Sequence, residues 1–230
     1  MDITDDSGNY RYGSRREKNR RKPWKFGRRR NQGRQALREV RKLKRQQMKQ
    51  VEKKWKDGLV NITNLVSGNP QYLSVTDIDQ GTTSSTRIGD EITLKSLTFR
   101  IRFHLLDSET IGGLIRWMLI YDRRPLGAQA TLTQVLNVGN STTAIMNMNP
   151  QYRGRFQILH DSMLQLNVSG KQFGSSKGYI PLRNLKCKYN ATGGGVSDQQ
   201  TGNLFIAVVS NGNDANLQIN GYLRIRFTDE

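Results

Sequence analysis

The residues near the N-terminus carry the clearest chemistry in this sequence. The segment RREKNRRKPWKFGRRRNQGR, residues 15–34, interleaves basic side chains with two large aromatic rings. Arginine and lysine neutralise phosphates, and an aromatic ring stacks on an unpaired base. The segment therefore predicts contact with single-stranded nucleic acid. The residues expected to make this contact are Arg15, Arg16, Lys18, Arg20, Arg21, Lys22, Trp24, Lys25, Phe26, Arg28, Arg29, Arg30 and Arg34.

The positive charge of the chain is concentrated in the same region. The 230 residues carry a formal net charge of +18. Residues 1–56 hold 21 Lys and Arg against six Asp and Glu, whereas residues 57–230 hold 16 against 13. Such a field attracts polyanions, first nucleic acid and second an acidic membrane surface. Because residues 1–35 combine dense like charge with few aliphatic side chains, we expect them to be disordered on their own.

Residues 36–57 form a segment of a different kind, a predicted basic amphipathic helix that ends at Asp57-Gly58. Three interpretations are open: a helix that lies on nucleic acid, a membrane-surface helix, or a coiled-coil segment. The adjoining arginine-rich arm favours nucleic acid, and we expect no membrane partner. One helical face gathers the apolar residues Leu37, Val40, Leu43, Met48, Val51 and Trp55. The expected nucleic-acid contacts on the opposite face are Arg38, Arg41, Lys42, Arg45 and Lys49.

From residue 58 to residue 230 the hydrophobic period changes to two, the period of a strand. Expected strands are LTFRIRFHLL, GLIRWMLIYD, MLQLNVSG, NLFIAVVSN, YLRIRF and YIPLRNLKCKY, the last an edge strand because of Pro181. Long polar loops and almost no helix indicate an all-β antiparallel sandwich or barrel. Two of these strands alternate arginines with apolar residues. The arginines are Arg100, Arg102, Arg224 and Arg226.

The sequence offers no arrangement typical of an enzyme, and we expect none. Neither His104 nor His160 has a carboxylate or cysteine at a ligand spacing. Cys187 is the only cysteine, so an intramolecular disulfide is impossible. We expect no cofactor, apart from weak candidates for a Ca²⁺ site where subunits meet. These candidates are Asp77, Asp79, Asp90 and Glu91.

Several segments, taken in order, resemble the coat proteins of geminiviruses. IRWMLIYDRRPLGAQATLTQVLN resembles their apolar strand that runs into Asp-Arg-Arg-Pro and a short helix. YRGRFQILHDSMLQLNVSGKQ resembles the two strands that follow, and YLRIRFTD resembles their closing strand. A second resemblance, by pattern, is to the coat protein of satellite tobacco necrosis virus, on DIDQGTTSSTRIGDEITLKSLTFR and LTQVLN. Together these segments cover most of residues 75–228.

The resemblance implies a single eight-stranded jelly roll, with a disordered arm (1–35), a basic helix (36–57) and a shell domain (58–230). It further implies a capsid protein of a small circular single-stranded DNA virus or a satellite virus, with 60 copies in the simplest icosahedral shell. The expected partners are other copies of the chain and a single-stranded genome, DNA favoured over RNA. The expected location is the virion, after a stage in the host nucleus or cytoplasm. The basic clusters of the arm could also bind nuclear import factors.

The sheet arginines leave two interpretations open. The resemblance implies that the first and last strands are neighbours, so that Arg100, Arg102, Arg224 and Arg226 would form one basic strip for nucleic acid. Alternatively, these arginines pair with acidic residues across a subunit contact. For the whole chain, the competing function is a cellular β-barrel protein, ribosomal or chaperone-like, that binds nucleic acid with a basic tail.

Overall fold

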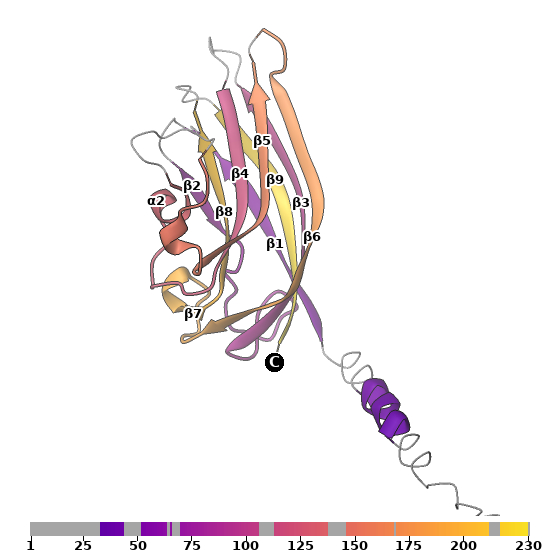
Figure 1. The fold of residues 1–230 in the computed structure, drawn as a ribbon. Helices are drawn as coiled ribbons and strands as arrows, with labels where there is room; N and C mark the ends of the chain where they lie inside the picture. The colour runs from indigo at the N-terminus through magenta and orange to yellow at the C-terminus, as the bar shows by residue number, and fades with distance from the viewer. Residues whose placement is uncertain are drawn as a thin grey trace, which may run out of the picture. The chain divides into compact units, whose positions relative to one another are not determined.

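The computed structural model describes residues 33–43, 52–63, 65, 70–105, 113–137, 146–167, 169–211 and 217–229. The chain divides into two compact units, Met1–Gln50 and Val51–Glu230. In the second unit, strands are arranged in two facing layers (Figure 1). No helix in the described part of the chain is long and apolar enough to span a membrane.

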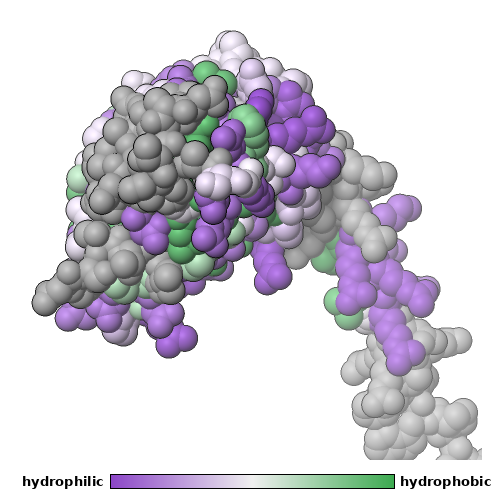
Figure 2. All heavy atoms as spheres, turned by 90° about the horizontal axis from the view of Figure 1, so that it is seen from above, coloured by the Kyte–Doolittle hydropathy of each residue, from purple (hydrophilic) through white to green (hydrophobic). Residues whose placement is uncertain are grey.

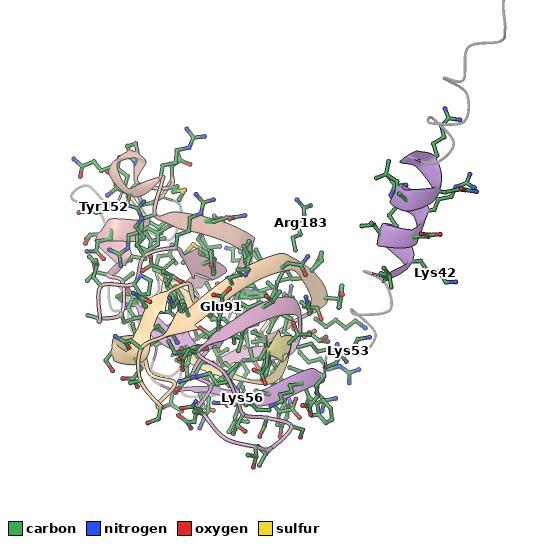
Figure 3. The ribbon with its side chains drawn as sticks, turned by 90° about the horizontal axis from the view of Figure 1, so that it is seen from below. Lys42, Lys53, Lys56, Glu91, Tyr152 and Arg183 are labelled. Atoms are coloured by element: carbon green, nitrogen blue, oxygen red, sulfur yellow. The ribbon has the colours of Figure 1, made fainter. Side chains whose placement is uncertain are left out.

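In the first unit, residues 33–43 are helical, which agrees with the expected helix over residues 36–43. Its apolar side chains Leu37, Val40 and Leu43 recur every three residues, so they lie near one face. Every side chain of this helix is exposed. Lys42 lies at one end of it (Figure 3). The continuation through residues 44–51 lies outside the described residues.

The expectation that this helix runs to residue 57 is wrong, because residues 53–57 belong to the first strand, β1 (Lys53–Ile62). The good helix formers there are overridden by tertiary contacts. Lys54 is buried, and its Nζ donates to the Thr86 carbonyl at 3.0 Å and pairs with Asp229 at 2.8 Å. Backbone pairing with the last strand fixes the extended form, from Lys53 opposite Thr228 onward.

The second unit is a sandwich of two antiparallel sheets. The five-stranded sheet has the order β1-β9-β3-β6-β7, and the four-stranded sheet has the order β2-β8-β4-β5. Short helical turns occur in the connections. The remaining bounds are β2 (Gln71–Ser74), β3 (Glu91–Leu105), β4 (Gly113–Asp122), α2 (Leu132–Val135), η1 (Pro150–Tyr152), β5 (Phe156–Leu166), β6 (Phe173–Tyr189), η2 (Val196–Asp198), β7 (Gln199–Thr201), β8 (Asn203–Ser210) and β9 (Leu217–Asp229).

This strand order is that of a jelly roll with one additional short strand, so the predicted fold class is confirmed. The extra strand is β7, which pairs only with the last two residues of β6. Pro181 lies in the stretch of β6 that has β3 on one side and no paired strand of the described chain on the other, as expected for an edge. The expected strand MLQLNVSG is in fact the end of β5, which begins at Phe156 and stops at Leu166.

The core lies between the sheets and follows the predicted alternation. In β3, Leu97, Phe99, Ile101, Phe103 and Leu105 are buried, while Arg100 and Arg102 between them are exposed. The buried side chains face the other sheet, where Trp117 of β4 packs edge-to-face on Phe99 with ring centroids 4.8 Å apart. Burial of such side chains is the main favourable term in folding.

The two sheets differ in what covers their outer faces. Every residue of β8 is buried, on both faces of the four-stranded sheet. A second apolar cluster covers the outer face of that sheet, formed by side chains of β4 and β8 with α2 and the segments around it. The five-stranded sheet has no such cover among the described residues, because alternate residues of β1, β9, β3 and β6 are exposed. The surface open for binding is therefore the outer face of the five-stranded sheet.

The turn after β4 is built around Asp122, which is buried. Its carboxylate accepts two hydrogen bonds from Arg155, at 2.9 and 2.6 Å, and one from the backbone N–H of Arg124 at 3.0 Å. The side chains of Arg123 and Arg124 are exposed. Thr131 and Gln134 then form a capping box at α2, the short helix expected there.

Candidate nucleic-acid interface

The outer face of the five-stranded sheet presents its side chains in rows across four strands. In one row, Leu59 of β1 lies opposite Tyr222 of β9, Tyr222 opposite Arg100 of β3, and Arg100 opposite Lys177 of β6. All four side chains are exposed, and Tyr222 is 71% exposed. Directly opposite residues of an antiparallel pair have their Cβ atoms about 5 Å apart. An aromatic ring therefore lies beside Arg100 on an open sheet surface, and Lys177 lies one strand further along the row.

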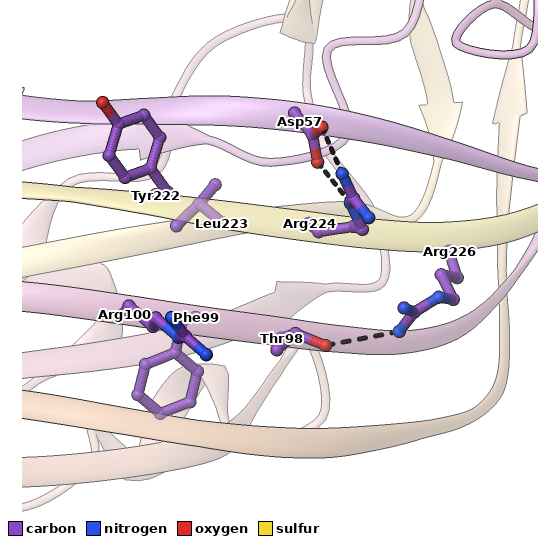
Figure 4. Close-up of a pocket in the computed structure, with 8 residues that line it drawn as sticks. All are labelled: Asp57, Thr98, Phe99, Arg100, Tyr222, Leu223, Arg224 and Arg226. Atoms are coloured by element: carbon purple, nitrogen blue, oxygen red, sulfur yellow. Dashed lines mark hydrogen bonds and ion pairs between the residues drawn. The ribbon is translucent and has the colours of Figure 1, made fainter.

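A second row contains the neutralised arginine of this face. Arg224 lies opposite Asp57 of β1 and Thr98 of β3. Its Nε and one Nη donate to the two oxygens of Asp57 at 2.6 and 2.7 Å (Figure 4). The hydrogen bond from Arg224 lowers the pKa of Asp57, and nearby Arg226 contributes to the same direction. In this structure the partner of Arg224 is a carboxylate of its own chain, and both side chains are about half exposed. The two earlier interpretations of the four arginines stay predictions.

The other two sheet arginines have weaker contacts. Arg226 donates to the Thr98 hydroxyl at 3.4 Å, near the limit of a hydrogen bond. The guanidinium of Arg102 lies 5.0 Å from the ring centre of Phe173 on β6, a cation–π contact on the surface. Neither has a carboxylate partner among the described residues, so both retain their charge for an external anion.

Two hollows flank the row of Tyr222. The larger is about 560 Å³ and is lined by Asp57, Thr98, Phe99, Arg100, Tyr222, Leu223, Arg224 and Arg226 (Figure 4). The smaller is about 390 Å³ and is lined by Arg100, Ile101, Arg102, Ser175, Ser176, Lys177, Asn220, Gly221 and Tyr222. They share Arg100 and Tyr222, so the hollows meet on either side of this pair.

Two other hollows of the described surface lack this combination of residues. In the view from above, hydrophilic residues predominate and hydrophobic patches are small (Figure 2). The pocket lined by Gly113, Leu114 and Asn211 contains no cation. The pocket lined by Ile158, Pro181 and Arg183 is mainly aliphatic. The combination of an exposed aromatic ring, several cations and two adjoining hollows occurs in the described chain at the sheet face.

Comparison with known proteins identifies the family. The model of the geminivirus coat protein/nuclear export factor BR1 family matches residues 4–228. The chain belongs to this family. The predicted resemblance to geminivirus coat proteins is therefore confirmed, whereas the second resemblance, to a satellite virus, remains one of pattern.

The relatives and solved structures that resemble this chain share little sequence identity with it. The capsid protein of Bean golden yellow mosaic virus (isolate Puerto Rico) is 24% identical over 110 residues, which are 46% of this chain and 43% of that protein. The match thus spans less than half of that relative. The structure of Desmodium yellow mottle tymovirus has a TM-score of 0.35 at 10% identity, covering 78% of this chain and 88% of that one. The 60-mer BFDV capsid protein gives 0.28 at 10% identity, covering 78% and 93%.

The structure brings together only part of the predicted nucleic-acid site of this coat-family chain. Four predicted residues share one sheet face, as expected: Arg100, Arg102, Arg224 and Arg226. The pair of neighbouring strands that brings them together differs from the expected pair. The strand with Arg100 is the third, not the first, and β9 lies between β1 and β3. Arg34, Arg38, Arg41 and Lys42 are exposed on the helix over residues 33–43. Outside the described residues are Arg15, Arg16, Lys18, Arg20, Arg21, Lys22, Trp24, Lys25, Phe26, Arg28, Arg29, Arg30, Arg45 and Lys49.

Within one chain, the weak Ca²⁺ candidates do not gather into a cation site, and the expected site where subunits meet stays a prediction. An oxygen of Asp79 accepts from the Gly194 N–H at 2.9 Å, Asp90 lies 3.5 Å from Arg87, and Glu91 pairs with Lys186. Within the described ranges, no three His, Cys, Asp or Glu residues gather as a metal site would require. The carboxylates instead hold the loops in place.

Sequence reasoning missed the aromatic residues of the sheet face. Tyr222 precedes Arg224 by two residues, so strand alternation alone could have placed it on the same side. Trp55 was assigned to the apolar side of a helix, but it is 43% exposed on β1. Lys177 lies in the polar stretch GSSKG, where nothing in the local sequence distinguishes it from a loop residue.

Proposed function

We propose that this chain is a structural coat protein that assembles with copies of itself into a small icosahedral shell and packages a single-stranded genome. The observation that carries the proposal is the match to the coat protein family over residues 4–228, combined with a jelly-roll unit preceded by a strongly basic segment. Sixty copies are proposed because this is the simplest closed icosahedral arrangement of identical subunits.

The distribution of charge supports packaging through the N-terminal segment. Residues 11–56 carry 21 basic and three acidic residues, a net charge of +18. Sixty such segments hold about 1,080 positive charges, enough to neutralise most phosphates of a genome of roughly one to a few thousand nucleotides. Recognition of one short sequence does not require this excess, whereas packaging does. DNA is favoured over RNA because the resemblance is to coat proteins of single-stranded DNA viruses.

A second candidate function comes from the description of the family, which also names a nuclear export factor. In that case the chain would carry nucleic acid through the host nucleus without forming a shell. The basic clusters of residues 15–30 could serve a nuclear import receptor in either case. The two functions differ in whether the purified protein assembles.

The test is to purify the full chain and examine it by analytical ultracentrifugation and electron microscopy. The expected result is closed particles of a size close to a 60-mer, and the nucleic acid extracted from them should be sensitive to DNase and resistant to RNase. A stable monomer at high protein concentration would contradict the coat function and support the transport function. RNase sensitivity would contradict only the choice of genome.

A further inference from the structure

We propose that the outer face of the five-stranded sheet holds a second nucleic-acid site, distinct from the basic arm, in which an unpaired base stacks on Tyr222. The flanking phosphates contact Arg100 and Lys177 on one side and Arg226 on the other. This inference rests on the proposed function, because it identifies where the packaged strand meets the folded shell domain. It assigns base contact to a residue of the sheet rather than to the arm alone.

The cations around Tyr222 are available to an external anion. Arg100 and Lys177 lie in the same row as Tyr222 and have no ion-pair partner among the described residues. Of the described residues that line the two hollows, Asp57 is the only carboxylate, and it is engaged by Arg224. Four positive charges, on Arg100, Arg102, Lys177 and Arg226, therefore remain uncompensated around the two hollows. A phosphate chain complements such a surface.

The ring of Tyr222 is placed where a base can reach it. It is 71% exposed on the outer face of the sheet. The exposed Leu59 beside it extends the apolar surface toward β1. Hollows on both sides provide space for two adjacent nucleotides. Stacking on an open aromatic ring is tolerant of sequence, as packaging requires.

The charge of the face argues for a nucleic acid over a second copy of the chain. Two copies meeting through this face would oppose Arg100, Arg102, Arg226 and Lys177 with the same residues, and like charges that approach closely repel each other. A single strand offers both a negatively charged backbone and unpaired ring systems. It therefore complements the cations and the exposed tyrosine together.

The basic segment leads in the sequence into a β-strand of this face. Strand β1 begins at Lys53, directly after the basic segment in the sequence, and its residues Trp55, Asp57 and Leu59 belong to the same face. A genome bound by the arm is thus bound to a segment that continues into β1, and β1 borders the proposed site. The arm supplies affinity through charge, and the sheet adds a contribution that depends on the base.

The experiment measures binding of the full chain to two oligonucleotides of equal length and charge, oligothymidine and its abasic counterpart. The variants are Tyr222→Ala, Tyr222→Phe and Arg100→Ala. The control is Tyr179→Ala, because Tyr179 is 63% exposed on the same sheet but lines neither hollow. We expect the wild type to prefer oligothymidine by more than about tenfold, since one base stacked on Tyr222 contributes about this factor and Trp24 and Phe26 of the arm add to it.

In Tyr222→Ala that preference should fall by about tenfold, to the part supplied by Trp24 and Phe26 of the arm, while binding of the abasic oligomer stays unchanged. Tyr222→Phe and Tyr179→Ala should retain the wild-type preference. Arg100→Ala should weaken both oligomers equally and reduce the salt slope by about 0.7. Ultraviolet crosslinking of nucleic acid within purified particles, mapped by mass spectrometry, should identify the peptide that contains Tyr222.

The proposal is overturned if Tyr222→Ala keeps the preference for oligothymidine, or if the wild type has none. It is also overturned if Tyr222→Ala changes particle formation and leaves the preference intact, because the face is then a subunit contact. If the full chain binds neither oligomer, the packaging function itself is wrong. If the full chain binds both oligomers and Tyr222→Ala keeps the wild-type preference, only the proposed site on the sheet is wrong. The packaging function is not contradicted by that result.

Discussion

Two arginine–aspartate pairs of similar geometry have different consequences for the chain because they differ in burial. The pair of Arg155 and Asp122 is enclosed at the turn after β4, where Asp122 is 1% exposed. The pair of Arg224 and Asp57 lies on the sheet face, with both side chains about half exposed. Water screens the charges of the exposed pair. In the buried pair little water reaches the charged groups, so each is stabilised mainly by its partner. The first pair therefore contributes to the fold and the second to the charge of a surface.

Replacement of Asp122 by alanine should destabilise the fold by about 3–5 kcal/mol, because the Arg155 guanidinium loses its partner in a buried site. The backbone N–H of Arg124 loses its acceptor as well. Chemical unfolding measured by circular dichroism checks this result. Asp57→Ala is the matched control, with an expected loss below about 1 kcal/mol. Equal losses in the two variants would refute the difference that we assign to burial.

The titration of Asp57 should report its contact with Arg224. Because the pKa of Asp57 is lowered in the folded chain, the contribution of the pair to stability is present above the ordinary aspartate range and is lost as the pH falls through the lowered pKa. In Arg224→Ala the pKa of Asp57 should rise toward its ordinary value, measured by carboxyl NMR. Arg226→Ala should raise it less, since Arg226 acts through charge alone. A larger shift in Arg226→Ala would contradict the assignment.

At the scale of elements, the approach of β3 to β9 determines the shape of the binding face. Gly221 of β9 lies opposite Ile101, and a Cβ at Gly221 would come within 2.3 Å of the Arg100 carbonyl oxygen. The neighbouring backbone cannot move without breaking the ladder between these strands. A glycine is thus required here by close approach rather than by an unusual backbone angle.

Gly221→Ala should destabilise the sandwich by about 1–3 kcal/mol, the usual cost of overpacking, and lower the melting temperature accordingly. It should also disturb the row of Arg100 and Tyr222. Thermal unfolding provides the measurement. Gly154→Ala serves as the control, because a Cβ at Gly154 meets no atom within 4 Å. If both variants melt at the wild-type temperature, β3 and β9 do not approach each other at Gly221 as closely as the structure indicates.

For the whole molecule, the dominant property is that charge and fold are separated along the chain. The segment before β1 carries most of the excess positive charge, while residues 57–230 are close to balance. The jelly roll leaves one sheet uncovered, and that sheet bears four exposed cations without an ion-pair partner among the described residues, Arg100, Arg102, Lys177 and Arg226. A coat protein with this division can hold a genome chiefly through the arm and assemble through the shell domain.

Deletion of residues 1–35 should therefore reduce the packaged nucleic acid strongly while the shell domain still folds. The removed residues include 12 of the 37 basic side chains. The ratio of absorbance at 260 to that at 280 nm in purified particles measures the nucleic-acid content. Circular dichroism of the same sample provides the control for folding. An unchanged content in the truncated protein would show that the arm does not package the genome.

Alternation of apolar and polar residues is a local property, so the sequence by itself indicated the sandwich class, most strand positions and the polar side of Arg100, Arg102, Arg224 and Arg226. The family resemblance added the jelly roll. Residues 53–57 were misassigned because their helix propensity is local, whereas the pairing of β1 with β9 and the burial of Lys54 are not.

Which strands are neighbours, and so which side chains share a surface, was decided only by the tertiary structure. The sequence showed Asp57, Tyr222 and Lys177 as unrelated positions. Pairing of β1, β9, β3 and β6 placed them on one face and neutralised Arg224 with Asp57. It left Arg100 beside an exposed ring, with Lys177 one strand further away. Contacts between residues more than a hundred positions apart depend on how the whole chain packs, and no local pattern encodes them.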